Sequence, residues 1–326
     1  RRPPRSTPLY SSAASDVYKR QILITGGAGF IGSHLVEKLV QKKNDVIVID
    51  DLSTGYLKNL DNVLDDIIFI QEDVSNYDLF SIGNIESVIH LSAQTSVPLS
   101  IEDFKNSSRT NLMNNLNVIN FCSKANVSLI YASSSSVYGN NPLGDDMSPS
   151  VDLMSPYAVD KYSMELYAKM AKKAYGLSSI GLRFFNVYGP RQDPSSQYSG
   201  VISIFIDRLN TGSKIQINGG YQTRDFVFVS DVVNVIEKSM HLTESQLICE
   251  TVNVLTGDTY TITRLLEILS SILNKNPIVD ERDLPNGDPE SSDGTIDKMC
   301  RLFAIDTKQM IDLHSGLEKT INFEVK

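Results

Sequence analysis

Tyr157 and Lys161 have the spacing of an acid–base pair. They stand four residues apart in "SPYAVDK", so on a helix they share one face and their side chains can meet. A free phenol has a pKa of about 10, too high for a good base at neutral pH. A neighbouring ammonium group favours the phenolate and lowers that pKa. The pair predicts a tyrosine that moves protons, although a surface tyrosine beside a solvated lysine has the same pattern.

A run of four serines stands just before this pair. It fills the middle of "YASSSSVYG", Tyr131 to Gly139. Serine runs are usually solvated linkers. Here the preceding "SLIYA" is typical of a buried strand, so the run stands where a sheet strand ends. We therefore expect one of the serines to face the same site as Tyr157 and Lys161, and we interpret Ser133 as polar packing at the strand end.

A glycine-rich turn lies near the start of the chain, in "TGGAGFIG". It stands between an apolar strand and an amphipathic helix, where a turn that binds phosphate must stand. Gly26 can make the tight turn, Gly29 lets the backbone approach a pyrophosphate, and Gly32 allows close packing of helix and strand. The anion would rest on the N-terminus of the following helix, and we expect Phe30, Ile31 and Gly32 among the cofactor contacts.

Two acidic residues at later strand ends refine this prediction. Asp50 closes the strand "VIVID", where a carboxylate can accept hydrogen bonds from the adenine ribose and repel a 2′-phosphate. The combination favours NAD over NADP. Asp73 follows the strand "IIFIQ" and can accept from the adenine amino group, with Val74 in backbone contact. A plain turn aspartate at position 73 fits nearly as well.

Short β-branched runs alternate with amphipathic segments from Ile22 onward, which is typical of βαβ units. Ser155 and Pro156 mark the start of the helix that carries Tyr157, and Gly176 marks its end. The remaining elements are expected as strands at "ILIT", "SVIHLS", "SSIGLRF" and "TVNVL" and as helices near 111–124, 201–209, from Asp231 behind a cap at Ser230, and from Thr261.

The expected fold class is α/β: a Rossmann-type doubly wound parallel sheet with a smaller α/β C-terminal substrate-binding lobe. The regular alternation ends after Asn186, where Gly, Pro, Ser and Asn become frequent. We therefore assign residues 22–186 to an NAD-binding domain and residues 187–326 mainly to the substrate lobe, with some segments returning to the first domain.

Composition excludes several classes of protein. The chain of 326 residues is 41% hydrophobic and 21% charged, which is typical of a globular protein with a substantial core. No apolar run approaches the roughly 18 residues of a membrane span, so we expect no membrane partner. Three scattered cysteines and four histidines form no ligand pattern. We expect a cytoplasmic setting, reduced thiols and no metal.

The first 21 residues differ from the rest in composition. They hold five basic residues, one acidic residue and three prolines, and resemble translated sequencing-adapter read-through. We expect residues 1–21 to be a non-native leader, with the protein beginning near Ile22. Without this leader of net charge +4, the formal charge of −9 becomes −13, which argues against nucleic-acid binding.

Six motifs of the chain resemble those of a known enzyme family. "TGGAGFIG", "EDV", "HLSA", "SSSSVYG", "SPYAVDK" and "LRFFNVYGPRQDP" occur in the order and spacing of the extended short-chain dehydrogenase/reductases. The chain most closely resembles their nucleotide-sugar epimerase and dehydratase group, in particular the UDP-glucose and UDP-N-acetylglucosamine 4-epimerases. The resemblance runs from about Ile22 to the end of the chain.

The resemblance implies a reaction and residues that perform it. Tyr157 takes the proton from a sugar hydroxyl at C4, Lys161 holds the nicotinamide ribose, and a serine bonds the same sugar oxygen. Hydride passes from C4 to NAD and returns to the opposite face of a transient 4-keto sugar. The remaining cofactor contacts that it implies are Ala93 and Asn111.

The family's catalytic hydroxyl lies three residues before the valine of "VYG", which gives Ser134. Relatives that dehydrate or decarboxylate the sugar have acids after that hydroxyl. This chain has Ser135 and Ser136 there, and a hydroxyl cannot serve as acid or base at neutral pH. Epimerisation is therefore the simplest reaction that the resemblance leaves, and Ser136 is expected to contact the substrate.

The resemblance also places residues in a substrate pocket. Asn186 is expected on the nucleotide diphosphate, although a loop-capping asparagine is an alternative. Arg224 matches an arginine that pairs with the diphosphate. A second arginine expected before a "GD" pair is absent, because Pro285 and Asn286 stand there and Arg282 is the nearest basic residue.

Ser292 replaces a bulky tyrosine of relatives restricted to non-acetylated sugars, which favours UDP-GlcNAc and UDP-GalNAc.

Alternatives to the epimerase remain at this point. Another nucleotide-sugar epimerase or a reductase has the same Ser-Tyr-Lys set, and a non-catalytic nucleotide-binding regulator could keep the fold. By analogy with the family we expect a homodimer, with the helices near 111–124 and 157–173 as candidates for its interface.

Overall fold

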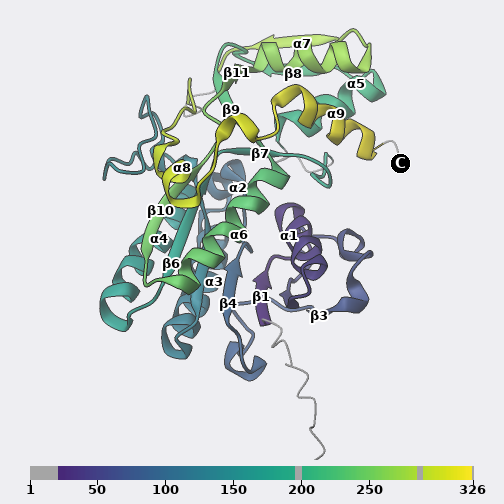
Figure 1. Cartoon of the computed structure of the whole chain (residues 1–326). Helices are drawn as coiled ribbons and strands as arrows, with labels where there is room; N and C mark the ends of the chain where they lie inside the picture. Colours follow the sequence, from purple (N-terminus) through teal and green to yellow (C-terminus); the bar gives the residue numbers. More distant parts are fainter. Residues whose placement is uncertain (1–20, 195–199, 285–288, 325–326) are drawn as a thin grey trace, which may run out of the picture.

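A parallel sheet of seven strands forms the centre of the molecule (Figure 1). The structure is a computed structural model and describes residues 21–194, 200–284 and 289–324. The strand order is β10-β6-β5-β4-β1-β2-β3, and each neighbouring pair runs parallel. These strands are β1 (Gln21–Thr25), β2 (Asp45–Ile49), β3 (Ile67–Ile70), β4 (Ser87–His90), β5 (Ser128–Ser134), β6 (Ser179–Phe184) and β10 (Cys249–Val254).

Helices cover both faces of this sheet, and a smaller lobe adds short strands. The helices are α1 (Phe30–Gln41), α2 (Val97–Glu102), α3 (Phe104–Ala125), α4 (Pro156–Tyr175), α5 (Val201–Thr211), α6 (Val229–Ser245), α7 (Ile262–Leu273), α8 (Asp297–Phe303) and α9 (Leu313–Glu324). The short strands are β7 (Asn186–Tyr188), β8 (Ile215–Asn218), β9 (Thr223–Phe228), β11 (Thr259–Thr261) and β12 (Val279–Arg282). The 3₁₀ helices are η1 (Leu57–Leu60), η2 (Leu64–Asp66), η3 (Leu79–Ile82), η4 (Ser135–Tyr138) and η5 (Thr307–Gln309).

The sheet is buried on both faces, which explains why its strands are continuous apolar runs. Successive side chains of a strand point to opposite faces. Ile22 and Ile24 of β1 pack with side chains of α1 and α6, whereas Leu23 packs with those of α3 and α4. The predicted α/β class with a doubly wound parallel sheet is therefore confirmed.

The strand order reverses between β1 and β4. The chain proceeds from β1 to β2 and β3 on one side, then crosses to β4, β5, β6 and β10 on the other. Ligands of open α/β sheets bind outside the carboxyl ends of the strands at such a switch point. The glycine turn follows β1, and the loop beginning at Leu91 follows β4, so both border this crevice.

The helix that carries Tyr157 has the ends that the sequence predicts. The Ser155 side chain accepts a hydrogen bond from the backbone N–H of Ala158, and Pro156 is the first helical residue. Gly176 ends the helix with a φ of 75°, a left-handed conformation that glycine adopts without strain. These caps fix where the face that bears Tyr157 and Lys161 begins.

The start of α6 corrects the sequence prediction. We expected a cap at Ser230, but α6 begins at Val229, directly after β9 ends at Phe228, and it has no side-chain cap. No loop residue separates strand from helix, so Ser230 already lies in the first turn. Asp231 instead accepts a hydrogen bond from the backbone N–H of Ile311.

The smaller lobe lies above the carboxyl ends of the sheet, where α5, α7 and β8 gather at the top of Figure 1. Its strands form a three-stranded sheet, β11-β9-β7, and the pair β12-β8. From the later part of the chain, α6 packs on the seven-stranded sheet and β10 pairs with β6. The domain division at residue 186 stays a prediction, and the predicted leader, apart from Gln21, lies outside the described residues.

None of the helices in the described part of the chain has the length and hydropathy needed to cross a membrane. Within the same residues, no three His, Cys, Asp or Glu side chains are grouped as metal ligands.

Candidate active site

The glycine turn after β1 is closely packed. Gly26 has a φ of +72°, and a Cβ there would lie 2.7 Å from the backbone nitrogen of Ser92. A Cβ on Gly32 would lie 2.1 Å from the carbonyl oxygen of Gly26. Both positions therefore require glycine, for backbone conformation at the first and for close approach at both.

The N-terminus of α1 opens from this turn. Gly29 is the N-cap residue and provides no side-chain cap, and the first N–H groups of a helix have no partner within the helix. The backbone of Phe30, Ile31 and Gly32 forms this first turn. The arrangement fits the pyrophosphate of a dinucleotide, which those N–H groups and the helix dipole favour.

Asp50 lies against the same turn. Its carboxylate accepts hydrogen bonds from the backbone N–H groups of Ala28 and Leu52, both at 2.9 Å. Burial raises its pKa, and these two hydrogen bonds oppose the rise. A carboxylate has about four acceptor sites, so two remain for ribose hydroxyls. The residues of the turn and Asp50 thus fit an NAD-type cofactor.

Asp73 and Val74 follow β3 in a turn. One carboxylate oxygen of Asp73 accepts from the backbone N–H of Ser75 at 2.8 Å, the arrangement of the plain turn aspartate that the sequence left open. Val74 is buried, and its carbonyl accepts from the Asn117 amide of α3 at 2.6 Å. Contact of either residue with adenine stays a prediction.

Asn111 supports the loop that carries Ala93. Its side chain accepts from the backbone N–H of Gln94 at 2.9 Å and donates to the carbonyl of Gln94 and the carboxylate of Asp160, both at 3.2 Å. The amide is thereby engaged with the protein on both ends. A direct contact of Asn111 or Ala93 with the cofactor stays a prediction.

His90, which the sequence analysis did not single out, connects β1 with β4. Its Nδ1 lies 2.7 Å from the Thr25 hydroxyl and its Nε2 lies 3.0 Å from the side-chain oxygen of Asn115. Thr25 directly precedes the glycine turn. Burial lowers the pKa of His90 to about 4; the hydrogen bond to Asn115 opposes this change and the charge of Lys161 adds to it, so the ring is neutral at pH 7.

This neutral His90 predicts a pH dependence of stability. Its folded pKa of about 4 lies below the ordinary 6.5, so the unfolded chain binds the additional proton between these values. The stability is present above pH 6.5 and is lost as the pH falls towards 4, by about 3 kcal/mol. Urea unfolding from pH 7 to 4 is expected to show a shallower decline in His90→Gln than in wild type. Parallel curves for the two proteins would contradict a neutral native His90.

Ser134, Tyr157 and Lys161 come together at the carboxyl end of β5. Ser134 is the last residue of β5, and its side chain forms a hydrogen bond with that of Tyr157. The Lys161 ammonium donates to the carbonyl of Ala132 at 3.0 Å and lies 5.6 Å from the centre of the Tyr157 ring. The structure therefore brings the three residues predicted from the sequence into one site.

The electrostatics of Tyr157 correct one expectation. We expected Lys161 to lower the tyrosine pKa, but burial raises it to about 12, with the Ser134 hydrogen bond opposing the rise and Asp160 adding to it. Burial also lowers the pKa of Lys161 to about 8, and Asp160 opposes that change. The Lys161 ammonium is directed to the Ala132 carbonyl, and a lowering of the Tyr157 pKa by Lys161 together with a bound nicotinamide stays a prediction.

Ser136 lies next to this group. Its backbone N–H donates to the Ser134 hydroxyl at 3.1 Å. Its own hydroxyl is buried and has no hydrogen-bond partner among the residues that the structure describes. A buried hydroxyl without a partner costs free energy, so this oxygen is suited to a ligand.

The residues expected to bind the substrate lie on β7, on β9 and in the segment of Ser292. The Asn186 amide donates to the carbonyl of Asp225 at 3.1 Å and so connects β7 to β9. This contact is structural, like the loop-capping asparagine that the sequence left as an alternative. Arg224 of β9 donates to the carbonyl of Thr223 at 2.8 Å, and the backbone N–H of Ser292 donates to the same carbonyl at 3.1 Å. Arg224 and Ser292 are thus neighbours.

Arg282, the basic residue nearest to the position of the missing second arginine, binds a carboxylate of its own strand. Arg282 forms an ion pair at 3.0 Å with Asp280 on its own strand β12, and its side chain is 59% exposed. Its role as a diphosphate contact stays a prediction. Pro285 and Asn286 lie outside the described residues.

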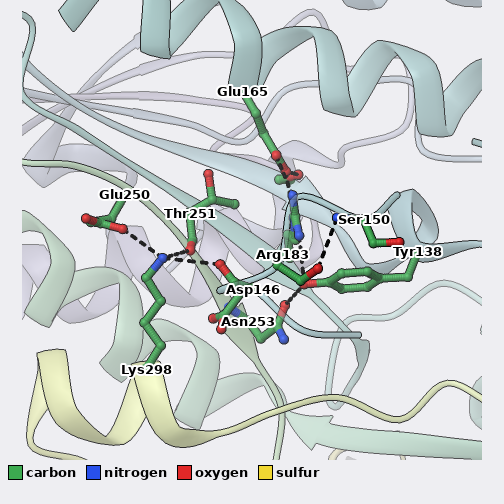
Figure 2. Close-up of polar contacts among 11 residues, drawn as sticks. Tyr138, Asp146, Ser150, Glu165, Arg183, Glu250, Thr251, Asn253 and Lys298 are labelled. Atoms are coloured by element: carbon green, nitrogen blue, oxygen red, sulfur yellow. Dashed lines mark hydrogen bonds and ion pairs between the residues drawn. The ribbon is translucent and has the colours of Figure 1, made fainter. Parts of the chain in front are cut away.

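A buried polar network around Arg183 and Glu165 was not predicted from the sequence (Figure 2). Arg183 of β6 and Glu165 of α4 form an ion pair at 2.6 Å, with 5% and 0% of their side chains exposed. Two features of the sequence indicate this buried ion pair. A charged residue inside the apolar strand "SSIGLRF" needs a buried partner, and Glu165 stands four residues after Lys161 on the same helix face.

Comparisons with known proteins identify the family of the chain. The profile of the NAD dependent epimerase/dehydratase family matches residues 22–254. A relative from Methanocaldococcus jannaschii, "Putative UDP-glucose 4-epimerase", is 38% identical over 76% of this chain and 81% of its own length.

Two solved structures have the same fold. The UDP-N-acetylglucosamine 4-epimerase of Methanobrevibacter ruminantium, in complex with UDP-N-acetylmuramic acid, is 35% identical with a TM-score of 0.86, over 94% of this chain and 98% of its own. The UDP-glucose 4-epimerase of Thermus thermophilus, in complex with NAD, is 31% identical with a TM-score of 0.82, over 93% and 98%. NAD is the cofactor, and the chain belongs to the NAD-dependent epimerase/dehydratase family.

Proposed function

We propose that the protein is an isomerase that interconverts UDP-hexoses differing at C4, with a transient 4-keto sugar as intermediate. The observation that carries this proposal is the group of Ser134, Tyr157 and Lys161 at the carboxyl end of β5, the same edge of the sheet as the glycine turn after β1. Ser135 and Ser136 follow Ser134, so the group lacks the adjacent acids that dehydration or decarboxylation would use.

Proton transfer falls to Tyr157. Its phenolate would accept the proton of the C4 hydroxyl, and Ser134 would hold the same oxygen through its own hydroxyl. NAD, when bound, supplies the acceptor of the C4 hydride and afterwards its donor. The residues of the protein raise the pKa of Tyr157 to about 12, so we infer that the charge of the oxidised nicotinamide is needed to favour the phenolate.

The remaining cofactor contacts belong to the same proposal. The first turn of α1 and Gly29 would hold the pyrophosphate, Asp50 the adenine ribose, and Lys161 the nicotinamide ribose. Asp73, Val74, Ala93 and Asn111 would line the rest of the crevice. Because the cofactor is regenerated in every cycle, we expect it to stay bound between cycles.

The substrate is proposed to be a UDP-hexose that can carry a 2-N-acetyl group. Asn186 and Arg224 would bind its diphosphate, and Ser136 its sugar. Ser292, a small side chain beside Arg224, leaves room for the acetamido group. A relative named as acting on UDP-GlcNAc and another named as acting on UDP-glucose are similarly close in sequence, so we expect UDP-GlcNAc and UDP-GalNAc to be used, with UDP-glucose and UDP-galactose as further substrates.

Product chromatography tests this proposal. Purified protein is incubated separately with UDP-GlcNAc and UDP-glucose, without added reduced cofactor, and the 4-epimers are quantified. We expect UDP-GalNAc from the first. Activity with UDP-glucose alone would refute the preference for acetylated sugars. A reaction that proceeds only with stoichiometric reduced cofactor would indicate a reductase instead.

A homodimer is proposed from the outer faces of α3 and α4, which pack on each other. Val159, Leu166 and Met170 of α4 are between 42% and 49% exposed and recur at helical spacing, and Met113 of α3 is 50% exposed. This apolar stripe is suited to a second copy of the same helix pair, forming a four-helix bundle.

Charge in this stripe is expected to separate the subunits. Leu166→Glu places a carboxylate in the proposed interface, where desolvation opposes association. Sedimentation velocity is expected to give a dimer for wild type and a monomer for the variant. Leu247→Glu is the matched control, because Leu247 is 63% exposed and follows α6 outside the stripe. A wild-type monomer, or a dimer in both variants, would refute this interface.

A further inference from the structure

The carboxyl ends of β5, β6 and β10 carry a row of buried polar side chains. Ser133 is paired in register with Arg183, and Arg183 with Asn253. Their exposed fractions are 2%, 4% and 0%. Because paired residues of neighbouring strands point to the same face, these three side chains form one continuous row, one residue from Ser134.

Glu165 joins this row to the helix that bears Tyr157. Its carboxylate accepts from the Ser133 hydroxyl at 2.6 Å. It also accepts from the Arg183 guanidinium at 2.8 Å and 2.6 Å (Figure 2). The guanidinium binds both carboxylate oxygens, so the geometry of the pair is fixed in a plane. No freedom remains for Glu165 to turn without breaking a buried hydrogen bond.

Helix α4 therefore contacts β5 at three levels. Tyr157, Lys161 and Glu165 stand four residues apart, on one face. Tyr157 bonds the side chain of Ser134, Lys161 the carbonyl of Ala132, and Glu165 the side chain of Ser133. The third contact is deepest in the protein and includes the only full charge pair of the three.

The row continues towards the substrate lobe. Arg183 donates to the Tyr138 hydroxyl, which donates to the side-chain oxygen of Asn253, both at 2.7 Å. The Asn253 amide donates to the carbonyl of Gly144 at 2.9 Å, and the backbone N–H of Gly144 donates to the carbonyl of Asp293 at 2.8 Å. Asp293 follows Ser292, so hydrogen bonds connect the Ser134 strand end with the segment that carries Ser292.

The stability of the core does not by itself require this arrangement. Apolar side chains of similar volume often replace a buried ion pair without loss of stability, because desolvation of the charges offsets their attraction. An apolar pair, however, does not fix the orientation of the strand end relative to the helix. A bidentate ion pair that also binds a serine determines that position.

We propose that Glu165 and Arg183 are positioning residues for the reaction. Through the Ser133 hydroxyl they hold the end of β5 against α4, so that Ser134 keeps its hydrogen bond to Tyr157. Through Tyr138 and Asn253 they tie this strand end to the segment of Ser292. The kinetic part of this inference rests on the proposed epimerase function.

Ser133→Ala tests the proposal more cleanly than a change of Glu165, because it leaves the ion pair intact and removes one hydroxyl. We expect kcat to fall about tenfold to a hundredfold, as for a small misplacement of reacting groups, with KM for the UDP-sugar little changed. Since the Ser134 hydrogen bond lowers the pKa of Tyr157, the acid limb of kcat/KM is expected to move to higher pH.

Two further variants make the test specific. Ser133→Thr keeps the hydroxyl and is expected to restore most of kcat. Ser128→Ala is the matched control, because Ser128 begins the same strand and its hydroxyl makes one hydrogen bond, to Ser87 at 3.1 Å. Wild-type kcat and an unmoved pH profile in Ser133→Ala, or an equal loss in Ser128→Ala, would overturn the proposal.

Hydrogen–deuterium exchange separates this inference from the proposed function. Faster exchange at residues 132–138 is expected in Ser133→Ala and not in Ser128→Ala, whatever reaction the protein catalyses. An inactive wild type would refute the epimerase assignment alone. Unchanged exchange at that strand end would refute the positioning role alone.

Discussion

Tyr157→Phe is expected to lower kcat for UDP-sugar interconversion by about a hundredfold to ten-thousandfold, the usual contribution of a general acid–base group. The variant keeps the buried aromatic ring and removes only the hydroxyl that is proposed to exchange a proton with the C4 oxygen. The Tyr157 hydroxyl forms a hydrogen bond with Ser134. No other described side chain is assigned to the transfer of the C4 hydroxyl proton, so we expect no other residue to replace Tyr157 in this role. Initial rates from product chromatography measure the effect.

A matched control separates chemistry from folding. Tyr175→Phe removes the hydroxyl of a tyrosine on the same helix that is 60% exposed, and it is expected to keep wild-type kcat. Bound NAD and the thermal midpoint are expected to be unchanged in both variants. Residual turnover of Tyr157→Phe above about a tenth of wild type would be too large for the loss of the acid–base group.

Gly32→Ala is expected to destabilise the protein and to abolish NAD retention. Alanine in a helix is favoured over glycine by about 1 kcal/mol. However, the new Cβ would lie 2.1 Å from the carbonyl oxygen of Gly26, which is backbone and cannot turn aside. Such an overlap costs about 1–3 kcal/mol and sometimes more, and it displaces the turn that is proposed to hold the pyrophosphate.

Gly29→Ala provides the contrast. A Cβ at this position lies 3.3 Å from the Gly26 carbonyl oxygen, and the φ of −75° suits alanine, so stability is expected to stay near wild type. The methyl group would still protrude where the pyrophosphate is proposed to lie, so retained NAD should fall. Thermal unfolding and cofactor extraction report the two quantities. A Gly32→Ala protein with wild-type stability and full NAD content would contradict the packing described for the turn.

The features that the sequence predicted well are those with a local cause. The glycine turn depends on residues within one strand–helix unit, and the ends of α4 depend on Ser155, Pro156 and Gly176. The order of strands and helices follows from apolar periodicity in the same way. A serine of the run could be placed with Tyr157 and Lys161 because a parallel sheet brings the end of one strand to the start of the next helix, and the family resemblance selected Ser134.

The features that the sequence did not predict depend on residues far apart in the chain. Arg183 and Asn253 meet only because β6 and β10 pair. The pKa of Tyr157 depends on burial by the whole site, so a lysine four residues away did not determine its direction. Asn186 could be chosen as a polar residue at a strand end, but its bond to the Asp225 carbonyl follows from the pairing of β7 with β9.

The fate of the hydrogen at C4 tests the central claim most directly. Purified protein is incubated with UDP-glucose or UDP-GlcNAc carrying deuterium at C4, in ordinary water and without added cofactor, and the epimer is isolated and analysed by mass spectrometry and NMR. The proposed hydride transfer predicts the inverted sugar with deuterium retained at C4. Loss of the deuterium to solvent, or no epimer from either sugar, would contradict the account.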